Sequence, residues 1–201
     1  SYKPSEDVFR FFEQLRYDSE FNSYTAEYVA PEYTWYPETA FHFHKKGKMF
    51  FAASAGHNDQ SHNHNDVGTF NLYYDNLPVM IDVGVGTYTR QTFSDERYGI
   101  WTMQSGYHNV PIINGVVQKD GREFEAKEVV SRPGFFSADI SGAYPAEAAV
   151  SQWVRSYKVK GESLEISDSF TLDELKAPNE IVFMTWGDVR LVKDGVVSVK
   201  V

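Results

Sequence analysis

From about residue 40 to the end of the chain, apolar and polar residues alternate in short runs, and turn-forming residues separate these runs. An alternation with a period of two is typical of β-strands that bury one face. The strands expected from it are residues 47–55, 67–75, 77–84, 109–118, 125–131, 134–141, 151–160, 163–172, 180–187, 189–193 and 196–201. Because no helical pattern interrupts them, we expect an all-β fold, an antiparallel two-sheet β-sandwich.

Three two-residue segments between these runs have the composition of hairpin turns. They are Asp75-Asn76, Gly161-Glu162 and Asp194-Gly195, and the last has the composition of a type I′ turn. On the strand before the second turn, alternation places one set of side chains on a single face, namely Trp153, Arg155, Tyr157 and Val159. We therefore expect three hairpins within the sandwich.

The N-terminal segment has a different pattern. Residues 5–16 carry apolar side chains at helical spacing, with Ser5 as the N-cap and acidic residues in the first turn. The aromatic and polar stretch that follows contains Pro31 and Pro37, which favours an extended connection. The expected organisation is one short helix and a linker over residues 1–38, then a β-sandwich over residues 39–201 that is truncated at its C-terminus.

Composition and charge narrow the range of partners. The chain has 201 residues, of which 42% are hydrophobic, and this balance is typical of a globular protein. No apolar run reaches the roughly 20 residues that a membrane helix needs, and the formal charge is −9. We therefore expect neither nucleic acid nor a membrane as a partner. Because the chain contains no cysteine, any metal must be held by histidine, carboxylate or amide oxygen.

Candidate metal ligands occur in the stretch SHNHNDVG, where His62, His64 and Asp66 occupy every second position. In an extended strand these three side chains would project from one face. Imidazole and carboxylate groups suit Zn²⁺ or a similar divalent ion. A His-x-His pattern is also common in proteins without metal, so surface histidines that form ordinary hydrogen bonds are an alternative interpretation.

Two later residues strengthen the metal interpretation. Asp82 interrupts the apolar run LPVMIDVG, and His108 precedes the run NVPII. A carboxylate in such a place is rarely left unpaired, although a strand-end aspartate that accepts backbone N–H groups is the alternative. For His108 the alternative is a turn histidine with satisfied hydrogen bonds.

The strand geometry restricts how these residues can meet. If Asp75-Asn76 is a two-residue turn, Asp82 lies opposite Thr69, which is roughly 16 Å along a straight strand from His64. A straight strand cannot bring His64 to Asp82. We therefore predict a bend or bulge near residues 65–68, where Gly68 offers the required backbone freedom.

The segments SHNHNDVGTFNLYYDNLPVMIDVGVGTYT and FSDERYGIWTMQSGYHNVPIINGVVQ resemble the heparinase II/III-like family of polysaccharide lyases. The resemblance covers roughly residues 35–130 and lies in the β-sandwich domain that follows an α-helical toroid. It implies that His64, Asp82 and His108 are zinc ligands and that His62 reaches the active cleft. It also implies that the toroid, with the catalytic tyrosine of the family, is a missing part of the same protein, and that the N-terminal helix belongs to the junction.

The resemblance further implies a function for the parent protein. Members of the family cleave uronic-acid polysaccharides, among them glycosaminoglycans, by β-elimination, and act on these acidic polymers in the periplasm or outside the cell. Removing the C5 proton of a uronate requires neutralisation of its carboxylate, a base and an acid. His62 can hydrogen-bond the uronate or transfer a proton, because imidazole titrates near neutral pH. The zinc is expected to be structural, because it would tie three separate backbone segments together and so orient His62.

Three further residues are candidates for substrate binding. Arg97 can bind a uronate carboxylate with two hydrogen bonds, and Tyr98 can stack on a sugar ring. Alternatively, Arg97 pairs with the neighbouring Asp95 and Glu96. Asn63 is a candidate for a sugar contact, as are Asn58 and Asn65, although a turn amide is the simpler interpretation for each. Three tryptophans are expected in the core rather than in a sugar site, namely Trp101, Trp153 and Trp186.

Two other classes of protein compete with a lyase. In a cupin-like metal enzyme, Gly56 and the pair His62 and His64 would form half of the first motif, but Gly68 or Thr69 stands where a glutamate is expected. In a non-catalytic sugar-binding or scaffolding β-sandwich, zinc would only stabilise the fold. Even if the parent protein is a lyase, the isolated chain is expected to be inactive, because the missing toroid would supply half of the cleft.

Overall fold

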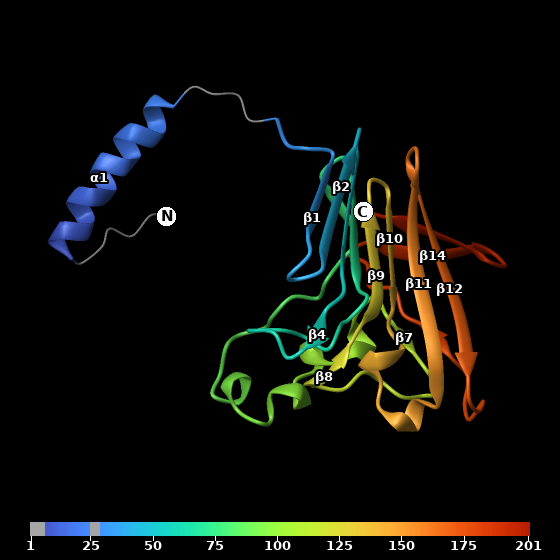
Figure 1. Ribbon diagram of the computed structural model, residues 1–201. Coiled ribbons are helices and arrows are strands. Elements are labelled where there is room, and N and C mark those ends of the chain that lie inside the picture. The colour runs from blue at the N-terminus through green and yellow to red at the C-terminus, as the bar shows by residue number, and fades with distance from the viewer. Residues whose placement is uncertain (1–6, 25–28) are drawn as a thin grey trace. The chain divides into compact units, whose positions relative to one another are not determined.

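The computed structural model describes residues 7–24 and 29–201, and Figure 1 shows the arrangement of their helices and strands. The chain divides into two compact units, residues 1–31 and residues 32–201, and each is described here by itself. Within the described residues, no helix is both long and apolar enough to cross a membrane.

The first unit contains the helix α1, Val8–Ser23. Its N-cap is Asp7, whose carboxylate oxygen Oδ1 accepts hydrogen bonds from the backbone N–H groups of Phe9 and Arg10 at 2.9 and 3.2 Å. The predicted cap Ser5 lies outside the described residues, and the first turn holds no acidic residue. The helix also continues past residue 16, the predicted end. None of its residues is buried.

The second unit is a β-sandwich of two antiparallel sheets, as the alternation of apolar and polar residues predicted. One sheet has five strands in the order β1-β2-β3-β5-β6, and the other has four in the order β12-β11-β10-β9. The strands of the first are β1 (Tyr33–Tyr36), β2 (Phe41–Lys46), β3 (Met49–Ser54), β5 (Phe70–Tyr74) and β6 (Leu77–Met80). Those of the second are β9 (Lys127–Arg132), β10 (Phe135–Asp139), β11 (Val150–Lys160) and β12 (Ser163–Leu172).

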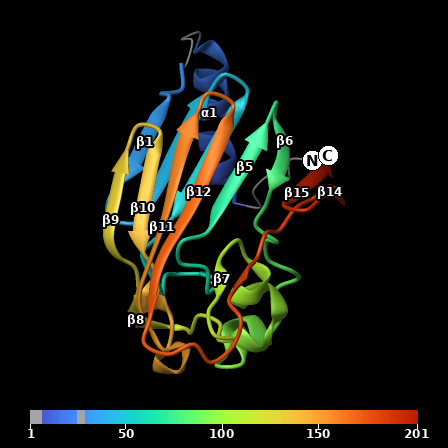
Figure 2. The same cartoon turned by 90° about the vertical axis from the view of Figure 1, so that its right-hand side faces the viewer.

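The core lies between the two sheets, and Figure 2 shows β9 to β12 in front of the five-stranded sheet. Tyr157 of β11 is fully buried, and its ring centroid lies 5.3 Å from those of Phe51 and Phe70 in the opposite sheet. Its hydroxyl donates a 2.6 Å hydrogen bond to the carbonyl of Gly68. The prediction that one face of β11 packs into the core is therefore correct. Tyr157 on this face also anchors the chain just before β5.

All three predicted hairpins are present, but the third forms a two-stranded sheet of its own and is not part of the two sheets of the sandwich. Tyr74 pairs with Leu77, Lys160 with Ser163, and Lys193 with Val196. The turn between β5 and β6 has positive φ at both central residues, Asp75 (50°) and Asn76 (65°), as a type I′ turn requires. The third turn joins β14 (Asp188–Lys193) to β15 (Val196–Lys200), and there only Gly195 has positive φ. Its expected type I′ geometry is therefore wrong.

Short elements at one end of the sandwich replace several of the expected strands. Residues 109–118 and 180–187 form only the two-residue strands β7 (Pro111–Ile112) and β13 (Glu180–Ile181), which pair with each other. The strand β4 (His57–Asn58) pairs with β8 (Gly121–Glu125). Single turns of 3-10 helix cover Gln91–Phe93, Arg97–Gly99, Trp101–Met103, Ser105–Tyr107, Ser141–Ala143 and Ala146–Ala148.

The tryptophans divide between core and surface. Trp153 is fully buried, as expected, and its ring stacks on Phe170 with a centroid distance of 4.3 Å. Trp101 and Trp186 are 53% and 74% exposed, so their assignment to the core is wrong. Both lie outside the sheets, in a 3-10 turn and in the segment before β14, where no second layer covers them.

A buried histidine makes this fold sensitive to acid. His42 of β2 is fully buried, and its ring centroid lies 5.5 Å from that of Phe51 and 5.4 Å from that of Phe136. Its Nδ1 lies 2.9 Å from the hydroxyl of Ser131 on β9. Burial, with a smaller contribution from His44, lowers the pKa of His42 to about 4 from 6.5.

Because the unfolded chain takes up this proton more readily than the folded one, stability is complete above pH 6.5 and is lost as the pH falls toward 4. We expect His42 to cost about 2 kcal/mol of unfolding free energy between pH 7 and about pH 4.5. Urea unfolding of the chain and of His42→Gln at both pH values measures this loss. A variant with the same pH dependence as the wild type would contradict it.

Candidate metal centre and adjoining site

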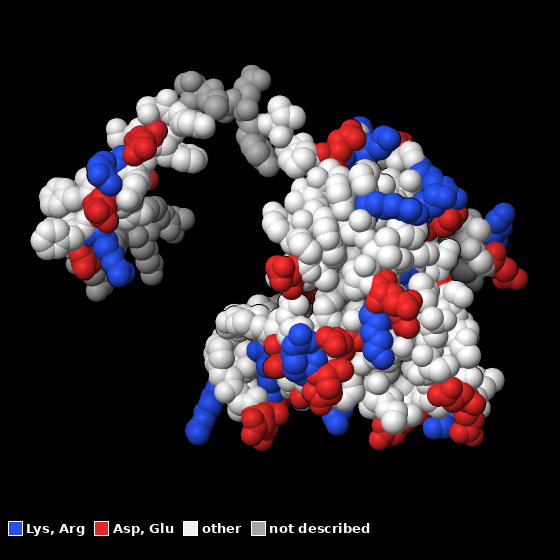
Figure 3. All heavy atoms as spheres, in the orientation of Figure 1, with Lys and Arg blue, Asp and Glu red and all other residues white. Residues whose placement is uncertain are grey.

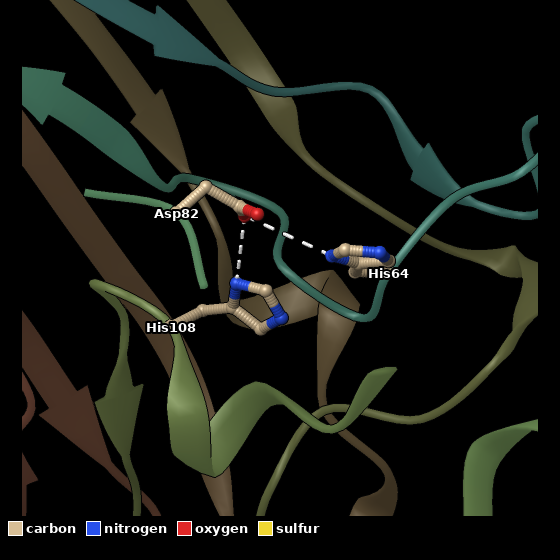
Figure 4. A group of neighbouring side chains, drawn as sticks. All are labelled: His64, Asp82 and His108. Carbon is tan, nitrogen blue, oxygen red and sulfur yellow. Dashed lines mark ion pairs between the residues drawn. The ribbon is translucent and has the colours of Figure 1, made fainter. Parts of the chain in front are cut away.

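Three side chains from three separate segments meet beside the start of β5, as Figure 4 shows for His64, Asp82 and His108. Asp82 Oδ2 lies 3.0 Å from His108 Nδ1 and 3.7 Å from His64 Nδ1. One ligand atom from each residue lies within 4.8 Å of the other two. The side chain of His108 is fully buried, that of His64 is 10% exposed and that of Asp82 is 31% exposed.

The chain reaches this geometry through the break that was predicted near residues 65–68. Gly68 has a φ of +87°, and a Cβ there would come within 2.7 Å of Ile140 Cγ2, so only glycine fits. The N–H of Thr69 donates to the carbonyl of Asp66 at 2.9 Å, which closes a turn just before β5 begins at Phe70. The turn carries His64 back toward the end of β6.

The expected extended row of His62, His64 and Asp66 is wrong. Residues 59–69 form turns and irregular backbone, and His62 has a φ of +62°. On one strand face, neighbouring members of this row would lie about 7 Å apart and the first and third about 13 Å apart, too far for one metal ion. Turns instead let His64 approach ligands that come from elsewhere in the chain.

Asp82 fulfils both of the roles considered for it. Its Oδ1 accepts a 2.6 Å hydrogen bond from the N–H of Gly84, while its Oδ2 faces the two imidazoles. Its own N–H donates to Asn71 Oδ1 at 2.7 Å, which fixes the residue at the end of β6. Burial alone would raise the pKa of Asp82, but the hydrogen bonds with His108 and His64 outweigh it and hold this pKa well below its usual range.

The buried ring of His108 is oriented by a backbone carbonyl. Its Nε2 lies 3.0 Å from the carbonyl oxygen of Thr102, which can only accept, so Nε2 carries the hydrogen. In the neutral ring, Nδ1 then has a lone pair facing the carboxylate of Asp82. Burial favours the neutral ring, but Asp82, together with the charge of Asp66, raises the pKa of His108 above its ordinary value.

This donor set fits a divalent metal ion. A lone pair on His108 Nδ1 and a carboxylate oxygen 3.0 Å away repel each other unless a proton or a cation lies between them. Ligands of a tetrahedral zinc ion lie about 3 to 3.5 Å apart, close to the two distances from Asp82 Oδ2. Hydrogen bonding of the second ring nitrogen to a backbone carbonyl is also the usual arrangement of a metal-bound histidine.

Asp66 adds a further acidic group at the edge of this cluster. It is half-buried, and burial raises its pKa to about 6. The charges of His108 and His64 oppose this rise, while the charge of Asp82 adds to it. Asp66 therefore lies close enough to interact with all three candidate ligands.

A hollow of about 330 Å³ adjoins the cluster, and its lining includes His62, His64, Asp66 and Asp82. The ring of His62 contacts Tyr88 and Phe93 edge-on, with centroid distances of 6.2 and 6.3 Å. Tyr88 and Phe93 stack on each other and are 48% and 68% exposed. Nothing in the sequence pointed to these two rings, because isolated aromatic residues in a loop are common.

Arg97 and Tyr98 both contact Asn63, so the structure brings the three predicted substrate-binding residues together. The guanidinium of Arg97 donates to the carbonyls of Thr92 and Asn63 at 2.9 and 2.8 Å. The hydroxyl of Tyr98 donates to Asn63 Oδ1 at 2.9 Å. Among the described residues Arg97 forms no ion pair with Asp95 or Glu96, so that alternative is wrong. Arg97 and Tyr98 hold the segment between His62 and His64 in place.

Two buried amides that the sequence did not point to hold the ligand segments. Asn109 is fully buried, and its Nδ2 donates to the carbonyls of Phe70 and Ile81, the residue before Asp82, at 2.8 and 2.9 Å. Gln118 accepts from the N–H of Val67 and donates to its carbonyl at 2.9 and 2.8 Å. The only signal in the sequence that could have identified Asn109 is its position directly after His108, a candidate ligand.

The other two asparagines of the loop are buried. Asn58 is 1% exposed, and its Nδ2 donates to Gln118 Oε1 and to the carbonyl of Lys119 at 3.1 and 3.0 Å. The side chain of Asn58 therefore has a structural role, as the simpler interpretation held. Asn65 is 4% exposed, and its backbone N–H donates to the carbonyl of Met103.

The fold and the site together define an antiparallel β-sandwich with a candidate His-Asp-His metal centre at one end of its five-stranded sheet. The sequence model of the family described as heparinase II/III-like, C-terminal, matches residues 29–196. The chain therefore belongs to the heparinase II/III-like family, as a C-terminal β-sandwich domain. This membership removes the cupin-like alternative. A search of curated proteins found no match.

Solved structures share the fold. The chain superimposes on heparinase III, the BT4657 gene product, with a TM-score of 0.65 and 14% identity, covering 92% of this chain and 30% of that one. A second heparinase III structure gives 0.64 and 17%, covering 92% and 31%. The heparan sulfate lyase HepC of Pedobacter heparinus gives 0.55 and 15%, covering 82% and 28%. The chain thus spans about a third of the length of these proteins.

Proposed function

We propose that this chain is the β-sandwich portion of a polysaccharide lyase that cleaves uronic-acid-containing polysaccharide by β-elimination. The observation that carries the proposal is the convergence of His64, Asp82 and His108 beside a hollow that His62 lines. Family membership and the likeness to heparinases support it. The remaining part of the cleft, with its catalytic tyrosine, belongs to an α-helical toroid elsewhere in the parent protein, so the isolated chain is expected to be inactive.

In this proposal the chain's own residues bind and orient the uronate. His62 is exposed at the hollow and can hydrogen-bond the substrate carboxylate or exchange a proton at an imidazole nitrogen. Arg97 uses two of its five N–H donors on backbone carbonyls, which leaves others for a sugar carboxylate. Asn63 lines the hollow, and Arg97 and Tyr98 each donate a hydrogen bond to this residue. A polymer of this kind is met outside the cytoplasm, so we also place the parent protein in the periplasm or outside the cell.

The metal, which we propose to be zinc, has a structural role here. His64, Asp82 and His108 would hold it, and its charge would neutralise the carboxylate of Asp82 where both imidazoles are neutral. The three residues belong to the loop before β5, the end of β6 and the segment before β7. Joining these segments fixes the backbone on both sides of Asn63 and so the direction of His62.

Replacing one ligand should remove the metal. We expect His64→Ala to weaken zinc binding by at least about a hundredfold, because two of three protein ligands are too few for a tight site. Zinc affinity of the wild type should also fall as the pH drops, because a histidine must lose its proton to bind metal and Asp82 raises the pKa of His108. Competition with a chromogenic chelator measures both effects.

A matched control is His57→Ala. His57 lines the same hollow, but its Nδ1 accepts the N–H of Asp59 and it is no member of the cluster. Zinc affinity within about threefold of the wild type is expected for it. Stoichiometric zinc in dialysed His64→Ala would exclude His64 as a ligand.

The lyase activity itself is tested on the full-length parent with several uronic-acid polymers, by the absorbance of the unsaturated product. Release of this product from at least one polymer is expected. A parent that cleaves none of them, while the domain still binds sugar, would show that the sandwich is a sugar-binding module and would refute the lyase.

A further inference from the structure

The outer face of the five-stranded sheet, which points away from the core, carries a continuous set of aromatic side chains. Along β2 and β3, buried and more exposed positions alternate, so one face of each strand lies outward. The register places Lys45 opposite Phe50, and Phe50 opposite Tyr73. We define the aromatic face as Tyr36, Phe41, Phe43, Phe50, Tyr73 and Trp186.

The rings of this face contact one another across four strands. Phe43 packs edge-on against Tyr36 and stacks on Phe50, with centroid distances of 6.0 and 6.2 Å. Phe50 in turn packs edge-on against Tyr73 at 6.0 Å. In Figure 3 the middle of the surface over β1 and β2 is mainly white, and acidic and basic side chains lie toward its ends. A contiguous exposed apolar surface of this kind marks a binding site more often than an accident of composition.

Two hollows follow the aromatic face and lead to the metal centre. One of about 500 Å³ lies at the β2–β3 turn, and one of about 510 Å³ lies beside Trp186. They share Phe50 and Tyr73 in their linings. The second hollow shares Asn71 and Asp82 with the hollow that holds His62. A chain-like ligand could therefore run from the turn to the catalytic hollow without leaving the surface.

The far end of this path is basic, although the chain as a whole is acidic. Lys45 and Lys48 line the first hollow, and His44-Lys45-Lys46 belongs to the longest basic stretch in a chain of net charge −9. Lys48 pairs with Asp75 at 2.8 Å, while Lys45 has no ion pair among the described residues. An anion bound at this end would thus meet a free ammonium group.

These groups suit one kind of occupant. Flat rings stack on the apolar faces of sugar units, and lysine binds their carboxylate or sulfate groups. A second protein domain on the same face would bury Lys45 without a partner, and the cores of protein interfaces are depleted of lysine. Charge complementarity and continuity with the hollow of His62 both favour an acidic sugar chain.

We propose that the aromatic face binds an acidic polysaccharide chain several sugar units away from the bond that is cleaved. The proposal rests on the proposed function and extends it, because it makes the domain select long acidic chains over short ones. Tyr73 supplies a stacking surface, and Lys45 supplies the charge at the far end.

The test uses two pairs of neighbouring residues that face opposite sides of the sheet. Tyr73→Ala and Lys45→Glu alter the aromatic face, while Tyr74→Ala and Lys46→Glu alter the residues next in the chain. Binding of heparan sulfate and alginate octasaccharides, with a neutral malto-octaose as reference, is measured by calorimetry on this chain. Thermal melting of each variant identifies any loss of fold.

We expect the chain to bind an acidic octasaccharide and not the neutral one. Tyr73→Ala and Lys45→Glu should weaken this binding by about fivefold to tenfold, and the two control variants by less than about twofold. The proposal would be overturned if the chain did not bind an acidic octasaccharide or bound the neutral one equally well. It would also be overturned if the test variants and the control variants lost the same amount of affinity. Variants that only lower the melting temperature of the full-length parent would identify the face as a domain interface and would also overturn it.

Kinetics of the parent separate this proposal from the lyase itself. Tyr73→Ala should raise the KM for a long polymer relative to the KM for a tetrasaccharide. An active parent in which this ratio does not change refutes only the aromatic-face proposal. A parent that cleaves no uronate polymer, while the chain binds an octasaccharide through Tyr73, refutes only the lyase.

Discussion

Replacing His62 by glutamine in the full-length parent is expected to lower kcat on a uronic-acid polymer by about a hundredfold to ten-thousandfold. This is the range that a positioned acid or base contributes. The ring of His62 lies at the hollow beside the metal centre, and the rings of Tyr88 and Phe93 restrict its orientation. Glutamine keeps hydrogen-bonding groups but cannot act as an acid or a base, so the substitution separates proton transfer from hydrogen bonding.

A second substitution separates the effect of losing the imidazole from any effect on the backbone conformation. His62 has a φ of +62°, a conformation that asparagine adopts more easily than most residues. His62→Asn should therefore fold as well as the wild type, bind zinc equally and lose as much activity as His62→Gln. A kcat within about threefold of the wild type in either variant would remove His62 from catalysis.

Asp168→Ala is expected to lower the free energy of unfolding by about 3 to 5 kcal/mol, the usual cost of leaving one partner of a buried ion pair alone. Arg155 is 1% exposed, and its Nε and Nη2 donate to the two carboxylate oxygens of Asp168 at 2.8 and 2.9 Å. The indole of Trp153 donates to Asp168 Oδ1 as well, at 2.7 Å. The truncation therefore leaves a buried guanidinium and a buried indole N–H without their acceptor.

The same substitution should reach the metal centre. Nη1 of Arg155 donates to the carbonyl of Asn109, the residue that follows His108, at 2.8 Å. A displaced Arg155 is therefore expected to weaken zinc binding in addition to stability. Urea unfolding with excess chelator measures the first effect, and zinc competition measures the second.

Two control variants bracket this result. Asp168→Asn keeps an acceptor oxygen and should cost less than Asp168→Ala. The double variant Arg155→Met, Asp168→Leu removes both charges and should recover a large part of the lost stability. If Asp168→Ala lost less than about 1 kcal/mol, the pair would contribute no more than an exposed ion pair does.

The hairpins show how far local sequence determines this fold. Asp75-Asn76 accommodates the positive φ values of a tight turn, and the strands on both sides pair with each other. The predicted register holds for Tyr74 with Leu77 and for Tyr73 with Pro78, and then a bulge shifts Leu72 to Met80. The turn composition did not predict this bulge, and beyond it the N–H of Asp82 donates to Asn71 Oδ1 of β5.

The candidate metal ligands, in contrast to the hairpins, could not be paired from local sequence. His64 and Asp82 are 18 positions apart, and the family resemblance, rather than the spacing, paired them. The spacing required only that the strand break near Gly68, and that break is confirmed. The extended row of His62, His64 and Asp66 failed because the hydrogen bonds of Val67 to Gln118 and of Asn65 to Met103 override the local alternation.

Alternation, turn composition and the aromatic core residues were enough to specify a two-sheet antiparallel sandwich, since these signals act between residues that are close along the chain. The packing of distant segments alone decided where Trp101 and Trp186 lie, how Arg97 and Tyr98 hold Asn63, and that Asn109 holds the segment of the candidate ligand Asp82. The physical reason is that a buried polar group must find a partner, and this partner can come from any segment that the packed sheets bring near.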